Sequence, residues 1–155
     1  MQAIAKKGNT MQIDHNAPLT IRKEIFISAS PEAVWQLHTD INHWADWRSD
    51  LSSATLEGLL QPGSVFVWKT PGVTITSTLQ EVETNRRIGW TGTGFGTKAA
   101  HIWTLEPHDN GTLVITEESM SGWLARVMKL FMPGFLDKSL DVWLGDLKKG
   151  LQDDA

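Results

Sequence analysis

From residue 51 to residue 120 the chain consists of short runs in which apolar and polar residues alternate, the period of two that is typical of β-strands. Turn-forming residues separate these runs, and Asp109-Asn110-Gly111 in particular favours a tight hairpin. A similar alternating run lies near the start of the chain. We therefore predict seven strands, mostly joined by short loops that favour antiparallel pairing, over residues 19–28, 53–59, 64–70, 73–83, 86–93, 97–107 and 111–120.

Two other segments repeat their apolar residues at helical spacing. Ser30 is a favourable N-cap and Pro31 suits the first helical position, so we predict a short helix there and a second one over 41–47. Residues 122–151 form a long helix that Pro133-Gly134 is expected to break or kink. Its apolar stripe consists of Leu136, Leu140, Trp143, Leu144, Leu147 and Leu151.

This order of elements predicts an α+β fold, in which a curved antiparallel sheet of seven strands has one face covered by the long C-terminal helix. Two short helices follow the first strand. A long helix laid across a curved sheet leaves space where the curvature is greatest, so an internal cavity is expected. Residues 1–18 show neither period and are predicted to form a flexible leader before a single domain over 19–151.

Composition narrows the chemistry that such a cavity can hold. The chain of 155 residues has eight tryptophans but no tyrosine and no cysteine. The absence of cysteine excludes disulfides, thiol nucleophiles and zinc–thiolate sites, and the absence of tyrosine excludes a phenolic acid. Acid–base chemistry in the cavity would therefore depend on histidine and carboxylates.

Charge and hydropathy indicate which partners to expect. The net charge of −4 and the scattered basic residues argue against nucleic acid. No stretch is apolar over the ~18 residues that span a bilayer, and no secretory signal is evident, so we expect a cytoplasmic protein without stable membrane insertion. No pattern specifies an oligomeric state.

The chain resembles the START-like (SRPBCC) superfamily, specifically its polyketide cyclase/dehydrase-like branch. The resemblance rests on ISASPEAVWQLHTDINHWADW, the stretch from LEG to PGSVFVW, STLQEVETNRRIGWTG, AHIWTLEP and GTLVITEESMSGW, which follow in order from about residue 21 to 123. It implies the helix-grip fold, in which the sheet wraps around the long C-terminal helix. It also implies a hydrophobic small molecule, lipid-like or aromatic, as ligand in the cavity between the two.

The resemblance also implies which strand faces point into the cavity. An apolar wall with a few convergent polar groups is typical of small-molecule sites. The expected ligand-binding residues are Phe66, Trp68, Ile75, Ser77, Leu79, Ile88, Trp90, His101, Trp103, Val114, Glu118, Trp123, Val127, Met128 and Phe131. The other four tryptophans, Trp35, Trp44, Trp47 and Trp143, are assigned to the core.

His101 and Glu118 are the candidate catalytic pair. If neighbouring strands bring them within reach inside an apolar cavity, they could serve as general acid and base, orient a ligand, or form a purely structural pair. Three functions follow: a binding protein, an enzyme of cyclase/dehydratase type without metal or organic cofactor, or a protein-interaction module like the chaperone-activating members of the superfamily.

Two other patterns carry a weaker signal. His38, Asp40, His43 and Asp46 lie close in sequence, but surface capping explains them better than a metal site, so none is predicted. The segment 123–136 is apolar with only two charges; it is expected to cover the sheet, although contact with a membrane surface is the alternative.

Overall fold

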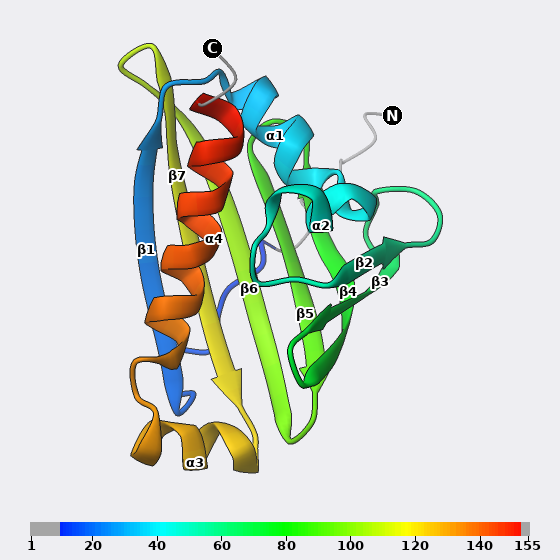
Figure 1. Ribbon diagram of the computed structural model, residues 1–155, viewed down its shortest axis with the longest axis vertical. Helices are drawn as coiled ribbons and strands as arrows, with labels where there is room; N and C mark the ends of the chain where they lie inside the picture. The colour runs from blue at the N-terminus through cyan, green and yellow to red at the C-terminus, as the bar shows by residue number, and fades with distance from the viewer. Residues whose placement is uncertain (1–9, 153–155) are drawn as a thin grey trace, which may run out of the picture.

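The computed structural model describes residues 10–152, and over this range the chain forms a seven-stranded antiparallel sheet with helices on one face (Figure 1). The predicted architecture is confirmed, including the helix-grip arrangement of sheet and C-terminal helix. The strands are β1 (Leu19–Ile27), β2 (Ser53–Leu56), β3 (Val65–Thr70), β4 (Val73–Glu83), β5 (Arg87–Gly94), β6 (Thr97–His108) and β7 (Gly111–Ser121). The helices are α1 (Pro31–Thr39), the 3-10 turn η1 (Ile41–His43), α2 (Trp44–Trp47), α3 (Trp123–Phe131) and α4 (Phe135–Gln152).

The strands lie in the order β1-β7-β6-β5-β4-β3-β2, so that the first strand closes one edge beside the last. The β6–β7 hairpin turns at Asp109 and Asn110, both of which have positive φ, as the two-residue turn predicted from Asp-Asn-Gly requires. Its register pairs His101 directly with Glu118. Sequence-local turn chemistry therefore sets which residues of these two strands face each other.

The helices begin and end where local chemistry dictates. The hydroxyl of Ser30 accepts a hydrogen bond from the amide of Ala33 (3.2 Å), which caps α1 as predicted. Pro133-Gly134 separates α3 from α4, so the two are distinct helices and α3 crosses the end of the molecule while α4 runs along the sheet (Figure 1).

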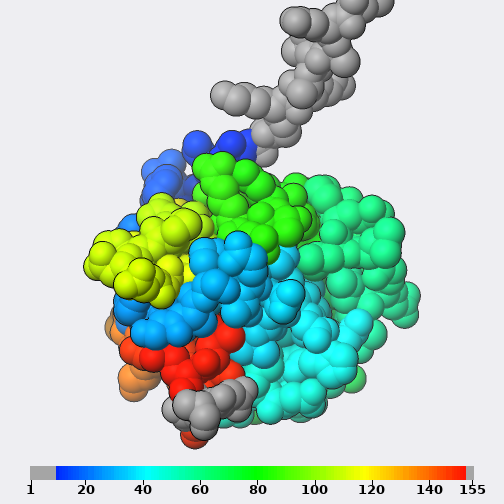
Figure 2. Space-filling model, turned by 90° about the horizontal axis from the view of Figure 1, so that it is seen from above, coloured from blue at the N-terminus to red at the C-terminus, as the bar shows by residue number. Residues whose placement is uncertain are grey.

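The core lies between the sheet and α4, and α1 and α2 complete the cover over the other half of the sheet. Seen from above, the α1–α2 segment lies beside the C-terminal part of α4 (Figure 2). The predicted apolar stripe of α4 is buried at Leu136, Leu140, Trp143, Leu144 and Leu147. Helix and sheet thus enclose one apolar interior in which Trp44, Trp103 and Phe66 are the largest fully buried side chains.

Part of the segment predicted to be a flexible leader contacts the sheet. The amide of Met11 donates to Glu81 (2.9 Å), its carbonyl accepts from Arg87 (2.6 Å), and the amide of Asp14 donates to Ser119 (3.0 Å). These strand residues face away from α4, so residues 11–14 cross the opposite face of the sheet (Figure 1). Residues 1–9 of the predicted leader lie outside the described residues.

The packing of α4 predicts that substitutions at its buried and exposed positions change the free energy of unfolding by very different amounts. Leu147→Ala removes a fully buried side chain and is expected to lower the free energy of unfolding by about 2–5 kcal/mol. Val142→Ala, on the exposed side of the same helix, should change it by no more than about 0.5 kcal/mol. Urea unfolding measures both; similar effects of the two substitutions would contradict the assigned packing.

Candidate ligand-binding site

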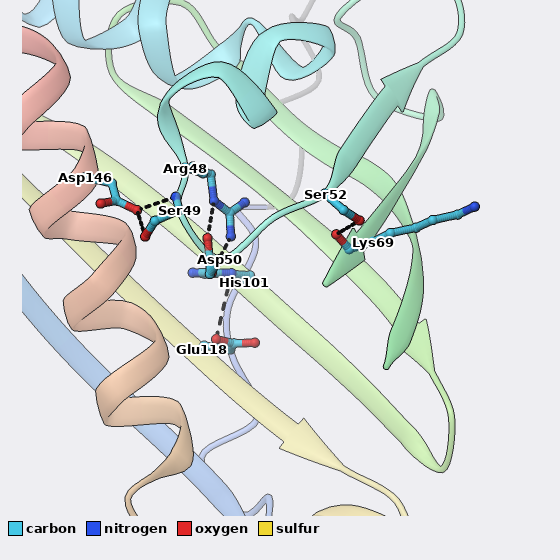
Figure 3. A network of polar contacts seen from close by, with 8 residues as sticks. All are labelled: Arg48, Ser49, Asp50, Ser52, Lys69, His101, Glu118 and Asp146. Carbon is cyan, nitrogen blue, oxygen red and sulfur yellow. Dashed lines mark hydrogen bonds and ion pairs between the residues drawn. The ribbon is translucent and has the colours of Figure 1, made fainter. Parts of the chain in front are cut away.

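A cavity of about 150 Å³ lies between the sheet and the helices α3 and α4. Its wall combines strand residues of β3, β4, β6 and β7 with the inner sides of both helices. The residues that line it are Arg48, Asp50, Trp68, Thr70, Val73, Ile75, Phe95, Thr97, His101, Glu118, Met120, Leu124, Met128, Phe135, Leu136, Ser139, Leu140 and Trp143. Most of this surface is apolar, and four of its polar residues, Arg48, Asp50, His101 and Glu118, lie near one another (Figure 3).

His101 projects from β6 into this space and is almost fully buried. Its Nε2 lies 2.8 Å from the Thr116 hydroxyl, a neighbour on β7 that holds the ring in place. Burial is the main cause that lowers the pKa of His101 well below its ordinary value, and the neighbouring His38 and Arg48 act in the same direction. The ring is therefore neutral at physiological pH.

Glu118 is the partner of His101 across the β6–β7 ladder. Its Oε2 lies 3.9 Å from the Nδ1 of His101, which is too far for a hydrogen bond, and no other hydrogen bond reaches this carboxyl group within residues 10–152. Burial raises its pKa to about 7, an effect that the charge of Arg48 partly opposes. Glu118 thus changes its protonation near neutral pH while it faces the cavity.

Arg48 is a site residue that the sequence reasoning missed. It follows α2, has only 3% of its surface exposed, and directs Nε and Nη2 at the two oxygens of Asp50 (3.2 and 3.1 Å). Its guanidinium lies 3.5 Å from the ring centroid of Trp143, with Trp44 and Trp68 also within about 5 Å. Burial lowers the pKa of Arg48 and the Asp50 carboxylate opposes that shift. The guanidinium is thus surrounded by indole rings, whereas its partner Asp50 is partly exposed.

The loop that carries Arg48 is fastened to α4 by its next residue. The amide and the hydroxyl of Ser49 both donate to Asp146 at 2.8 Å (Figure 3). In the sequence, this arrangement is visible only as three consecutive polar residues, Arg48, Ser49 and Asp50, directly after a short Trp-rich helix. A charged residue in that place is ordinarily expected at the surface.

His38 lies deeper, among the rings of Trp44, Trp90, Trp103 and Trp143, with its centroid 4.2 Å from that of Trp103. Neither ring nitrogen has a hydrogen-bond partner in the described part of the chain, and burial lowers its pKa to about 3. His43 instead pairs with Asp40 at the surface (2.9 Å). Within residues 10–152 no three side chains of His, Asp or Glu come together as metal ligands would.

The four tryptophans expected around the cavity lie in different places. Trp68 lines it, and Trp90 lines a smaller void of about 50 Å³ that also touches Ser77. Trp103 is fully buried behind them, whereas Trp123 is 58% exposed and stacks edge-on against Phe95. Trp143, which was assigned to the core alone, packs in the core and also lines the cavity.

The remaining predicted residues divide into three groups. Ile75 and Met128 line the cavity beside His101 and Glu118. Val127 and Phe131 are exposed, because the residues of α3 that face inward are Leu124 and Met128. Buried in the core without lining the cavity are Phe66, Leu79, Ile88 and Val114. The strand faces that the resemblance implied therefore do point toward the helices, but the resemblance did not indicate which part of each face is covered by core packing.

Comparison with known proteins agrees with this architecture. A family model described as polyketide cyclase/dehydrase and lipid transport matches residues 18–152. No curated protein matches the chain.

No helix among the described residues is long and apolar enough to cross a bilayer.

Several solved structures share the fold at low sequence identity. The hypothetical protein jhp0584 from Helicobacter pylori is 20% identical, with a TM-score of 0.80 over 89% of this chain and 90% of its own. The Zhui aromatase/cyclase from Streptomyces sp. R1128 is 14% identical, with a TM-score of 0.74 over 86% and 93%. A START superfamily protein from Mycobacterium smegmatis is 12% identical, with a TM-score of 0.69 over 88% and 99%.

The raised pKa of Glu118 predicts how the stability of the protein depends on pH. Its pKa is about 7 in the folded protein and near 4.5 when unfolded, so the folded protein keeps a proton that the unfolded chain has lost. Stability should therefore fall as the pH rises from about 4.5 through 7. Glu118→Gln removes this effect, so the variant should gain stability over wild type as the pH rises. Its effect on the free energy of unfolding is expected to be about 2–3 kcal/mol more favourable at pH 8.5 than at pH 4.5.

The control for this experiment is Glu106→Gln, which removes an exposed carboxylate from β6. Its effect on the free energy of unfolding should be small and nearly the same at both pH values. A Glu118→Gln effect that does not change with pH would show that the carboxyl group is not held in an environment that opposes ionisation.

Proposed function

We propose that the chain, which belongs to the polyketide cyclase/dehydrase and lipid transport family, binds a hydrophobic small molecule. The ligand would lie in the cavity between sheet and helices. The observation that carries this proposal is a mostly apolar cavity into which the carboxyl group of Glu118 projects without a hydrogen bond to any of residues 10–152. An apolar wall supplies affinity for a hydrophobic ligand, and the few polar groups in the wall supply orientation.

The size of the cavity limits what it holds without rearrangement. About 150 Å³ is the volume of a cavity that accepts a single benzene-sized ring, whereas sites for larger ligands begin at roughly 300 Å³. A lipid-like or multi-ring ligand therefore needs part of the wall to move. The α3–α4 junction is the segment best placed to do so, because Pro133-Gly134 joins the two helices there and the side chains of Phe131, Met132 and Phe135 face solvent.

The outer surface next to the cavity supports ligand entry at the α3–α4 junction. A groove of about 600 Å³, lined by Phe131, Met132 and other residues of the junction, shares Asp50, Phe135 and Ser139 with the cavity wall. Phe135 thus stands between the inner space and the outer groove. Rotation of this one side chain, with the junction flexing behind it, would join the two into a site long enough for an elongated ligand.

A second function is favoured by the His101–Glu118 pair. A neutral imidazole and a carboxyl group whose pKa is about 7 face one apolar space, and a group that titrates near the working pH is suited to general acid–base catalysis. In this role Glu118 would donate or accept the proton. His101, held by Thr116, would orient the substrate or the carboxyl group.

The binding proposal is tested by filling the cavity. Ser139→Leu adds a side chain at the wall between cavity and groove, while Gly145→Leu adds the same side chain to an open surface of α4. Calorimetric titration with para-cresol, 1-naphthol and decanoic acid is expected to show binding to wild type and to Gly145→Leu. The Ser139→Leu variant should bind at least about tenfold more weakly.

Two outcomes would contradict the binding proposal: wild type that binds none of the three probes, or a Ser139→Leu variant that binds them as tightly as wild type. The first would mean that the cavity is not a hydrophobic site. The second would place the bound probe elsewhere on the molecule.

Catalysis is separated from binding by Glu118→Gln, which preserves the shape of the side chain but removes its proton transfer. If the protein converts a compound that it binds, this variant is expected to lose about 10² or more in rate with little change in affinity, as followed by mass spectrometry of the product. Conversion that continues at the wild-type rate would exclude Glu118 as the acid or base.

A further inference from the structure

The outer side of α3 is an apolar surface that no described part of the chain covers. Leu130 and Phe131 are each 78% exposed, and Phe95, from the β5–β6 turn, stacks on Trp123 at its edge. We refer to this surface as the α3 patch, which consists of Phe95, Trp123, Val127, Leu130, Phe131, Met132 and Phe135. A contiguous group of seven large exposed apolar side chains is unusual for a monomeric domain and marks an interaction surface.

Helix α3 is apolar on two sides, and the fold requires only one of them. Leu124 and Met128 face the cavity and Ala125 is buried, so the inner side satisfies the fold. Trp123, Val127, Leu130 and Phe131 follow the spacing i, i+4, i+7 and i+8, which places them together on the other side. The fold does not require this second stripe, since polar residues there would leave the core unchanged.

The charged residues of the chain segment that forms α3 have one sign. Residues 119–136 contain Arg126 and Lys129 but no aspartate or glutamate, although the whole chain has a net charge of −4. Both cations are exposed, and neither forms an ion pair within residues 10–152. The next carboxylate, Asp137, is already paired with Lys23 (2.7 Å).

We infer that the α3 patch docks reversibly on an anionic lipid bilayer, with Trp123, Leu130 and Phe131 in the interfacial region and Arg126 and Lys129 against the headgroups. Aromatic and aliphatic side chains flanked by cations on one short helix are the composition of interfacial helices. The position of α3 across the end of the molecule allows it to lie in the plane of the bilayer while α4 points away (Figure 1).

A second copy of the chain fits this surface less well. A two-fold dimer formed through the α3 patch would bring Arg126 and Lys129 of both subunits to one interface, to which α3 contributes no carboxylate. An anionic bilayer instead complements both the apolar stripe and the charges. The inference rests on the α3 patch and stands whether or not the cavity binds a ligand.

The test is flotation of the full-length protein with vesicles of 70% phosphatidylcholine and 30% phosphatidylglycerol, compared with pure phosphatidylcholine. Binding is expected on the anionic vesicles and should weaken at high salt, because each cation near the surface adds to the attraction. The double substitution Leu130→Glu/Phe131→Glu should abolish flotation. Leu59→Glu, in the loop between β2 and β3 and also exposed (71%), is the matched control and should float like wild type.

Charge reversal tests the electrostatic part separately. Arg126→Glu/Lys129→Glu is expected to lower the partition coefficient at least about tenfold, whereas Lys148→Glu/Lys149→Glu, which changes the net charge equally at the far end of α4, should have a small effect.

The inference is overturned if wild type does not float with anionic vesicles, if it floats equally well with neutral ones, or if Leu130→Glu/Phe131→Glu floats like wild type. It is also overturned if sedimentation shows a dimer that this double substitution dissociates, since the α3 patch would then be an interface between copies of the chain.

Discussion

The site depends on the enclosure of the Arg48 guanidinium between Asp50 and the face of Trp143. Burying a charge is costly unless it is paired, and here the two hydrogen bonds to the Asp50 carboxylate and the contacts with indole faces offset part of that cost. The Nη1 of Arg48 has no hydrogen-bond partner among residues 10–152. The contact joins the loop after α2 to α4, and Ser49 adds a second link through Asp146. By holding the loop and the helix together over the sheet, this interaction closes one side of the cavity and also keeps a positive charge near Glu118 and His101.

The cavity and the groove next to it share wall residues at the α3–α4 junction. The inner space is the size of one ring, the outer groove is larger, and Phe135 belongs to the walls of both. The α3 patch lies on the outer side of the same junction, so a bilayer bound there would contact the segment whose movement would open the cavity. Entry of a hydrophobic ligand directly from a lipid surface would then require no passage of that ligand through water.

The sequence predicted those features that local chemistry determines. The hairpin at Asp109-Asn110 and the cap at Ser30 follow from turn and capping preferences, and the pairing of His101 with Glu118 follows from that hairpin's register. Arg48 could not be found in this way, because its burial depends on side chains from three separate elements. The assignment of Trp123 to the cavity failed for another reason: α3 is apolar on two sides, so periodicity alone could not identify the inner one.

The central claim is that the cavity between sheet and helices is a ligand site. Native mass spectrometry of the protein, purified gently from the organism that produces it, tests this most directly. The account predicts one chemically homogeneous, hydrophobic compound bound with a stoichiometry of one per chain and lost on mild activation. Protein recovered repeatedly without any bound compound, or with a heterogeneous mixture in no fixed ratio, would contradict it.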